Sequence, residues 1–125
     1  MIQINELRIG NLIRVNGILS KIEIINNELD EVYFLGEDFY HSDFCCNIEP
    51  IPITKEWLLK FGFLIIEING KFEATLPNFR YNIYWNKYTD GFLFCDGETV
   101  LINFNYVHEL QNLVFVLGQR ELTVA

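Results

Sequence analysis

One short helical segment, residues 51–63, interrupts a chain that otherwise consists of strand-like runs, and it constrains the fold more than any other feature. Both of its ends are marked, because Thr54 can cap the first turn and Gly62 can supply a left-handed stop. Trp57, Leu58 and Phe61 recur at i, i+1 and i+4, which predicts one apolar stripe along the helix. The chain therefore divides into a β region before this helix and a second region after it.

The first fifty residues are typical of a small, curved antiparallel sheet. Asn16-Gly17 is a strong hairpin signal between two apolar runs, and residues 39–48 fit either an edge strand or a long loop. The predicted strands are 12–15, 18–25 and 31–35. This pattern is compatible with a small SH3-like barrel.

After the helix, the apolar residues return to a period of two. Asn69-Gly70 and Asp96-Gly97 each predict a tight hairpin turn, and we expect a four-stranded meander over residues 64–102. Residues 105–117 predict a closing helix that packs on the meander. Its expected core stripe consists of Tyr106, Leu110, Leu113 and Leu117.

Together these elements predict an α+β fold in a single domain, residues 1–125. Residues 1–50 form its β subregion, and residues 51–125 form a subregion of two helices around the meander.

The net charge of −8 is concentrated in one stretch of the sequence. No Lys or Arg occurs between Lys21 and Lys55, whereas eight acidic residues lie there, and the other nine acidic residues match the nine Lys and Arg. Because phosphate backbones are bound by clustered Lys and Arg, direct nucleic-acid binding is disfavoured. The charge is compatible with a partner that has a basic surface. Alternatively, the acidic residues only keep the outer faces of an apolar sheet in solution.

The three cysteines are Cys45, Cys46 and Cys95, an odd count without the spacing of a disulfide or zinc framework. Cysteines of this kind are most often buried small hydrophobes in a reducing compartment. No apolar run reaches about 18 residues, and the first residues lack the basic start and apolar stretch of a signal peptide. These features predict a cytoplasmic protein with no membrane span and no cofactor.

Three blocks of sequence carry a resemblance to a known group of proteins. They are Glu6-Leu7-Arg8-Ile9-Gly10-Asn11, then Ile53-Thr54-Lys55-Glu56-Trp57-Leu58-Leu59-Lys60-Phe61-Gly62-Phe63, and finally Tyr106-Val107-His108-Glu109-Leu110-Gln111-Asn112-Leu113 with Gly118 and Glu121-Leu122. In this order the chain resembles a group of small uncharacterised proteins encoded in bacterial genomes, phages and mobile elements. The resemblance implies a phage or mobile-element context. It implies no activity and no catalytic residues.

The segment 40–46 concentrates the most reactive side chains of the sequence. On a strand, His41, Asp43 and Cys45 point to one face, where they are weak candidates for a metal site or for a small hydrolase with a cysteine nucleophile. No second ligand cluster accompanies them, and spacing alone only suggests a site. The structural alternative is that they only pack.

Two further groups are candidates for binding. His108 and Asn112 lie one turn apart on the closing helix, with Phe115 on the same flank, and they either bind a polar ligand or partner or bond to neighbouring backbone groups. The aromatic residues Tyr84, Trp85 and Tyr88 either stack a base or ring or pack across the strands.

These observations favour a non-enzymatic binding protein, an accessory factor of a phage or mobile element that acts on a host protein. The alternatives are a protein that sequesters a small nucleotide-like ligand in an aromatic pocket, and the hydrolase with His41, Asp43 and Cys45. We also expect a homodimer with Phe115 at or near the interface and the acidic segment 23–49 outside it, because facing acidic residues oppose association.

Overall fold

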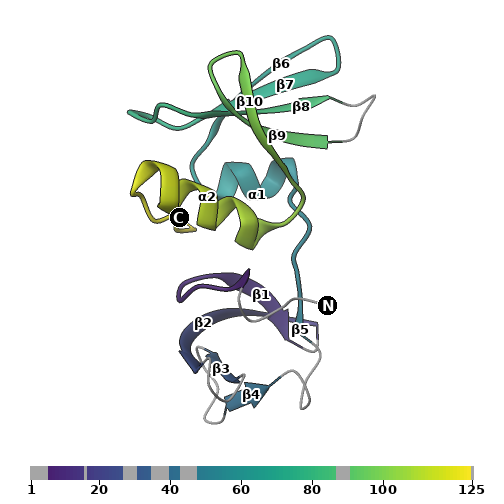
Figure 1. The fold of residues 1–125 in the computed structure, drawn as a ribbon. Coiled ribbons are helices and arrows are strands. Elements are labelled where there is room, and N and C mark those ends of the chain that lie inside the picture. Colours follow the sequence, from purple (N-terminus) through teal and green to yellow (C-terminus); the bar gives the residue numbers. More distant parts are fainter. Residues whose placement is uncertain are drawn as a thin grey trace. The chain divides into compact units, whose positions relative to one another are not determined.

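The computed structural model describes residues 6–15, 17–26, 31–34, 40–42, 48–86 and 91–124 (Figure 1). Its fold is α+β, as the sequence predicts, with two antiparallel sheets and two helices. By its internal contacts the chain forms two compact units. The first unit is Met1–Pro52 with Tyr106–Asn112, and the second unit is Ile53–Asn105 with Leu113–Ala125. Each is described by itself below.

The first unit holds a five-stranded sheet in the order β4-β3-β2-β1-β5. The last strand returns to pair with the first, because β5 is antiparallel to β1. This order is compatible with the SH3-like barrel suggested by the sequence. The residues between 39 and 48 contribute two short strands to it. The five strands are β1 (Leu12–Val15), β2 (Ile18–Asn26), β3 (Glu31–Phe34), β4 (Tyr40–Ser42) and β5 (Ile48–Glu49).

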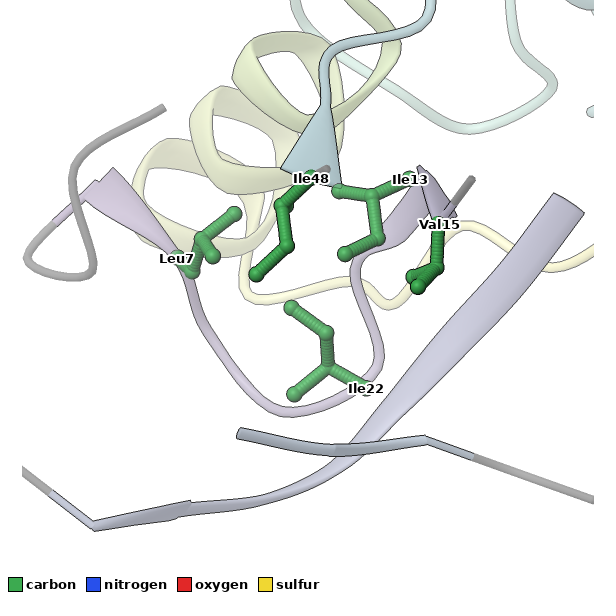
Figure 2. Packing of buried hydrophobic residues seen from close by; sticks show 5 residues of the cluster. All are labelled: Leu7, Ile13, Val15, Ile22 and Ile48. Carbon is green, nitrogen blue, oxygen red and sulfur yellow. The ribbon is translucent and has the colours of Figure 1, made fainter. Parts of the chain in front are cut away.

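A small aliphatic cluster forms the core of this unit. Its side chains come from the segment before β1 and from three strands, and they point toward one another in Figure 2. The cluster consists of Leu7, Ile13, Val15, Ile22 and Ile48, with Ile25 packed against it. The alternating burial of β1 places Ile13 and Val15 on this side, as expected for a strand with one covered face.

The second unit holds a meander of five strands, not four, in the order β10-β9-β8-β7-β6. Each apolar run between the turns forms its own strand, so the expected count was one too low. Asn69 and Gly70 both have positive φ, +53° and +77°, as a type I′ hairpin turn requires. The strands are β6 (Leu64–Ile68), β7 (Lys71–Thr75), β8 (Asn82–Asn86), β9 (Gly91–Asp96) and β10 (Thr99–Phe104).

Helix α1 (Lys55–Lys60) lies alongside this sheet in Figure 1 and follows the predicted start and stop signals. The Thr54 hydroxyl accepts a hydrogen bond from the Trp57 backbone N–H, 3.3 Å away. Gly62 takes the left-handed conformation, with φ +93°. Trp57, Leu58 and Phe61 are all buried, so the predicted apolar stripe is confirmed.

In helix α2 (Val107–Gly118), the buried stripe is displaced by one residue from the predicted one. The buried residues are Val107, His108, Leu110, Gln111 and Val114, whereas Tyr106 and Leu117 are exposed. The apolar pattern misplaces the stripe because two of its buried positions are polar. The first turns of this helix, up to Asn112, belong to the first unit, and the part from Leu113 onward belongs to the second. The expectation that the whole helix packs on the meander was therefore wrong.

The end of α2 is shaped by the ring of Phe79. A Cβ atom on Gly118 would overlap with this ring, and Gly118 itself does not have a positive φ. The left-handed residue is Gln119, with φ +52°. Arg120 covers the same ring at 5.2 Å and donates hydrogen bonds to the carbonyl oxygens of Pro77 and Asn78. Glycine is therefore required here for close packing.

Candidate functional site

The two faces of the meander separate the predicted aromatic pair, because successive residues of a strand point to opposite sides. Trp85 lies opposite Phe72 and Phe92 in the sheet register. Its ring stacks on Phe72 at 5.3 Å and lies 6.5 Å from Phe92. This is the covered face, which we call the inner face and which carries the buried residues Phe72, Ala74, Ile83, Phe94 and Phe104.

Tyr84 lies on the opposite side, which we call the outer face. The register aligns Ile66, Glu73, Tyr84 and Leu93 in one row across four strands. Leu64 begins the neighbouring row on β6. Leu64 and Ile66 are 63% and 58% exposed, so the β6 end of this row is an uncovered apolar surface. Tyr84 and Trp85 therefore cannot stack one ring between them, and Tyr88 lies outside the described residues.

A small polar cluster occupies the middle of the outer face. The Asn82 amide donates to Glu73 Oε2 at 2.6 Å and to the Tyr84 hydroxyl at 3.0 Å. The hydrogen bond with Glu73, followed by burial, raises the pKa of Tyr84. These contacts hold the Glu73 carboxylate in place between apolar neighbours.

Cys95 lies directly opposite Asn82 in the register and is buried. Burial raises the pKa of its thiol. Because the thiolate is the nucleophilic form, this cysteine is poorly suited to covalent catalysis at neutral pH.

A shallow hollow of about 300 Å³ adjoins this cluster at the β6–β7 hairpin. Its lining combines one carboxylate with one ammonium group and two apolar side chains. The lining residues are Ile66, Asn69, Lys71, Phe72, Glu73 and Tyr84. The carboxylate of Glu73 disfavours an anionic nucleotide in this hollow, because Lys71 alone cannot neutralise both this carboxylate and the phosphates of a nucleotide.

Asn112, the second predicted binding residue on α2, takes part in a network of hydrogen bonds within the first unit. Its Oδ1 accepts from Asn11 Nδ2 at 2.9 Å and from Arg8 Nε at 3.3 Å, and its Nδ2 donates to the Glu6 carbonyl oxygen at 2.9 Å. Gln111 completes the network. We call Arg8, Asn11, Gln111 and Asn112 the polar junction.

Gln111 is buried and serves three partners in the polar junction. Its Oε1 accepts from the Leu12 backbone N–H at 2.8 Å and from Asn11 Nδ2 at 3.5 Å, while its Nε2 donates to the Gly10 carbonyl oxygen at 3.1 Å. In the turn before β1, backbone groups thus form hydrogen bonds with the side-chain amide of Gln111 instead of with other backbone groups. This contact pattern accords with the structural alternative for Asn112, and the binding role of His108 and Asn112 stays a prediction.

The sequence reasoning did not select Arg8, Asn11 or Gln111. Two sequence signals could have indicated Gln111: its place after Leu110 in the apolar stripe of α2, and its place in the third block of the resemblance.

His108 is 1% exposed, and neither ring nitrogen has a hydrogen-bond partner among the described residues. Its ring stacks on Tyr106 at 6.0 Å. Glu6 Oε1 lies 3.8 Å from Nε2, which is too long for a hydrogen bond. Burial lowers the pKa of His108 below its ordinary value of 6.5, although Glu109 and Glu6 act in the opposite direction. The folded chain therefore holds this histidine neutral.

Acid is expected to destabilise the chain through His108. Since its pKa is lower in the folded state, the unfolded state binds the extra proton first, and stability that is present above pH 6.5 is lost as the pH falls toward the folded pKa. One such proton contributes at most about 1.4 kcal/mol per pH unit. Urea unfolding between about pH 7.5 and 5 should show a smaller loss for His108→Gln than for the parent.

His41 is the only other histidine, so His41→Gln is the matched control. It measures what the second imidazole contributes to the pH dependence of the parent. An equal loss of stability in His108→Gln and the parent would contradict a neutral buried His108.

Phe115, the third predicted residue on α2, lies in the second unit and is 42% exposed. Val116 and Leu117 beside it are also exposed. This flank of α2 thus presents apolar side chains to solvent, as the sequence suggested, although His108 is buried and does not share the exposure.

The candidate metal and hydrolase residues are largely outside the described structure. His41 belongs to β4, whereas Asp43 and Cys45 lie outside the described residues. Within the described ranges no group of three or more His, Cys, Asp or Glu side chains is placed to hold a metal ion. The metal site and the hydrolase stay predictions.

Comparison with protein-family models, curated proteins and solved structures finds no match for this chain. Of the helices described, none has the length and apolar character to cross a membrane.

Proposed function

We propose that this protein is a non-enzymatic binding protein that uses the outer face of the meander to hold a host protein, as an accessory factor of a phage or mobile element. The observation that carries the proposal is a pair of exposed apolar side chains on β6 beside a carboxylate that is held in place. Leu64 and Ile66 are more than half exposed, and Glu73 lies next to Ile66 in the register. Adjoining exposed apolar side chains with polar groups at their rim are typical of protein-binding sites.

The chemistry of the face specifies the partner. The Glu73 carboxylate is positioned by Asn82 and by Tyr84 before any partner binds. A lysine or arginine of the partner can meet it while apolar groups cover Leu64 and Ile66. The net charge of −8 also steers a basic surface toward this chain. A protein with an apolar site around a basic residue therefore fits better than a nucleotide.

The test uses variants of the outer face in affinity enrichment from bacterial lysate, followed by titration of the recovered protein. Ile66→Glu replaces an exposed apolar contact with a second carboxylate beside Glu73. It should weaken the complex on the order of 30-fold or more, as loss of a central contact does. Glu73→Gln should weaken it less and should reduce its dependence on salt.

Ile18→Glu is the matched control, because Ile18 is 65% exposed but belongs to the first unit. It should leave the complex unchanged. If the same protein binds equally to the parent and to Ile66→Glu, the outer face is not the binding surface.

A further inference from the structure

The edge strand β10 is a second uncovered surface, and its chemistry differs from that of the outer face. Val100, Leu101 and Ile102 are consecutive and are 53%, 45% and 48% exposed. β10 pairs with β9 on one side, and in the described part of the chain no other strand lies on its second side. Unpaired backbone groups beside exposed apolar side chains form a ready template for another strand.

Among the described residues, the chain pairs only with the continuation of this edge. The Ile53 backbone N–H donates to the Asn105 carbonyl oxygen at 2.9 Å, directly after β10 ends. The register with β9 shifts between Val100 and Ile102, which leaves Leu101 without an opposite residue in the sheet. The side chain of this bulged residue is thus available at the edge rather than committed to a pair.

The other edge of the same sheet is protected. On β6, Glu67 forms an ion pair with Lys55, and charged side chains at an edge discourage strand addition. β10 has no charged side chain, because the sequence from Thr99 to His108 contains no Asp, Glu, Lys or Arg. The bulge at Leu101 is the protective irregularity of this edge, and it leaves the flanking residues regular. The two edges therefore differ in their readiness to accept a strand.

From this asymmetry we infer that two copies of this chain associate through antiparallel contact of their β10 edges. A chain of net charge −8 can approach a second copy only where acidic residues do not face each other. In an antiparallel register centred on Leu101, Glu98 of one copy lies opposite Phe104 of the second copy. A parallel arrangement would place Glu98 beside Glu98. The antiparallel arrangement has two-fold symmetry and therefore ends at two copies, as in most homodimers.

One six-residue strand is a small contact. Stable interfaces bury about 800 Å² on each partner, and a single edge strand supplies less, so the dimer should depend on concentration. Phe115 on α2 is the competing surface expected from the sequence. It offers side chains alone, whereas β10 adds unpaired backbone donors and acceptors.

The test is light scattering over protein concentrations up to about 1 mM, where a micromolar dimer is fully populated. The mass should rise from 14.7 kDa for one chain to twice that value. Leu101→Lys should keep the monomer mass over the whole range. This substitution makes the net charge less negative, so its effect could not come from stronger overall repulsion.

Ile66→Lys on β6 and Phe115→Glu on α2 are the controls, and both should still dimerise. Because Ile66 lies on the outer face and Leu101 does not, the proposed function and this inference can fail separately. Hydrogen exchange should slow in β10 at high concentration in the parent and in both controls, but not in Leu101→Lys. A parent that stays monomeric, a dimer lost in Phe115→Glu but kept in Leu101→Lys, or growth beyond the dimer would each overturn the inference.

Discussion

Trp57→Ala is expected to lower the free energy of unfolding by about 3–5 kcal/mol, the range for removing a large buried aromatic side chain. Trp57 is buried in α1, its ring lies 5.7 Å from Phe61, and the Lys60 ammonium lies over it at 4.7 Å. The substitution leaves a cavity that six helical residues cannot close. Urea unfolding followed by circular dichroism measures the loss.

Leu59→Ala is the control for this prediction. Leu59 belongs to the same short helix but is 53% exposed, so its truncation should change stability by no more than about 0.5 kcal/mol. Equal effects of the two substitutions would show that helix propensity, and not burial of Trp57, determines the stability of α1.

Gln111→Ala should destabilise the chain by a similar amount, about 3–5 kcal/mol. It removes the side-chain partner of the Leu12 N–H and of the Gly10 carbonyl oxygen, and it leaves Asn11 Nδ2 with Asn112 Oδ1 alone. Each buried group left without a partner costs about 1–3 kcal/mol. Thermal and urea unfolding should both show the change.

Gln111→Met separates hydrogen bonding from volume, because it keeps the length of the side chain without its polar atoms. It should lose nearly as much stability as Gln111→Ala. The double variant Asn11→Ala, Gln111→Ala should lose less than the sum of the single variants, since the two side chains belong to one network. Full recovery in Gln111→Met would mean that the junction acts only by filling space.

The polar junction also explains two of the three sequence blocks that carry the family resemblance. The block at residues 6–11 and the block at residues 106–113 contribute Arg8, Asn11, Gln111 and Asn112 to one set of hydrogen bonds. Their joint occurrence therefore has a packing reason. The phage or mobile-element context remains part of the proposed function.

Local chemistry determined the elements that could be predicted from the sequence alone. Thr54, Gly62 and the Asn69-Gly70 turn act within a few residues of chain, so their conformations follow from capping, left-handed backbone geometry and hairpin twist. The period of two in β1 and the apolar stripe of α1 likewise mark buried residues without any knowledge of distant contacts.

Only the tertiary structure decided the burial of His108 and Gln111, two hydrophilic residues. The Gln111 side chain is placed by Gly10 and Leu12, about a hundred positions away. The tertiary structure likewise decided that Tyr84 shares a sheet face with exposed Ile66 while Trp85 packs among phenylalanines. A strand pattern with apolar residues on both sides does not say which face is covered or which edge stays open. Those choices depend on how five strands pair and on what packs against them, which is the sum of many distant contacts rather than a property of any one segment.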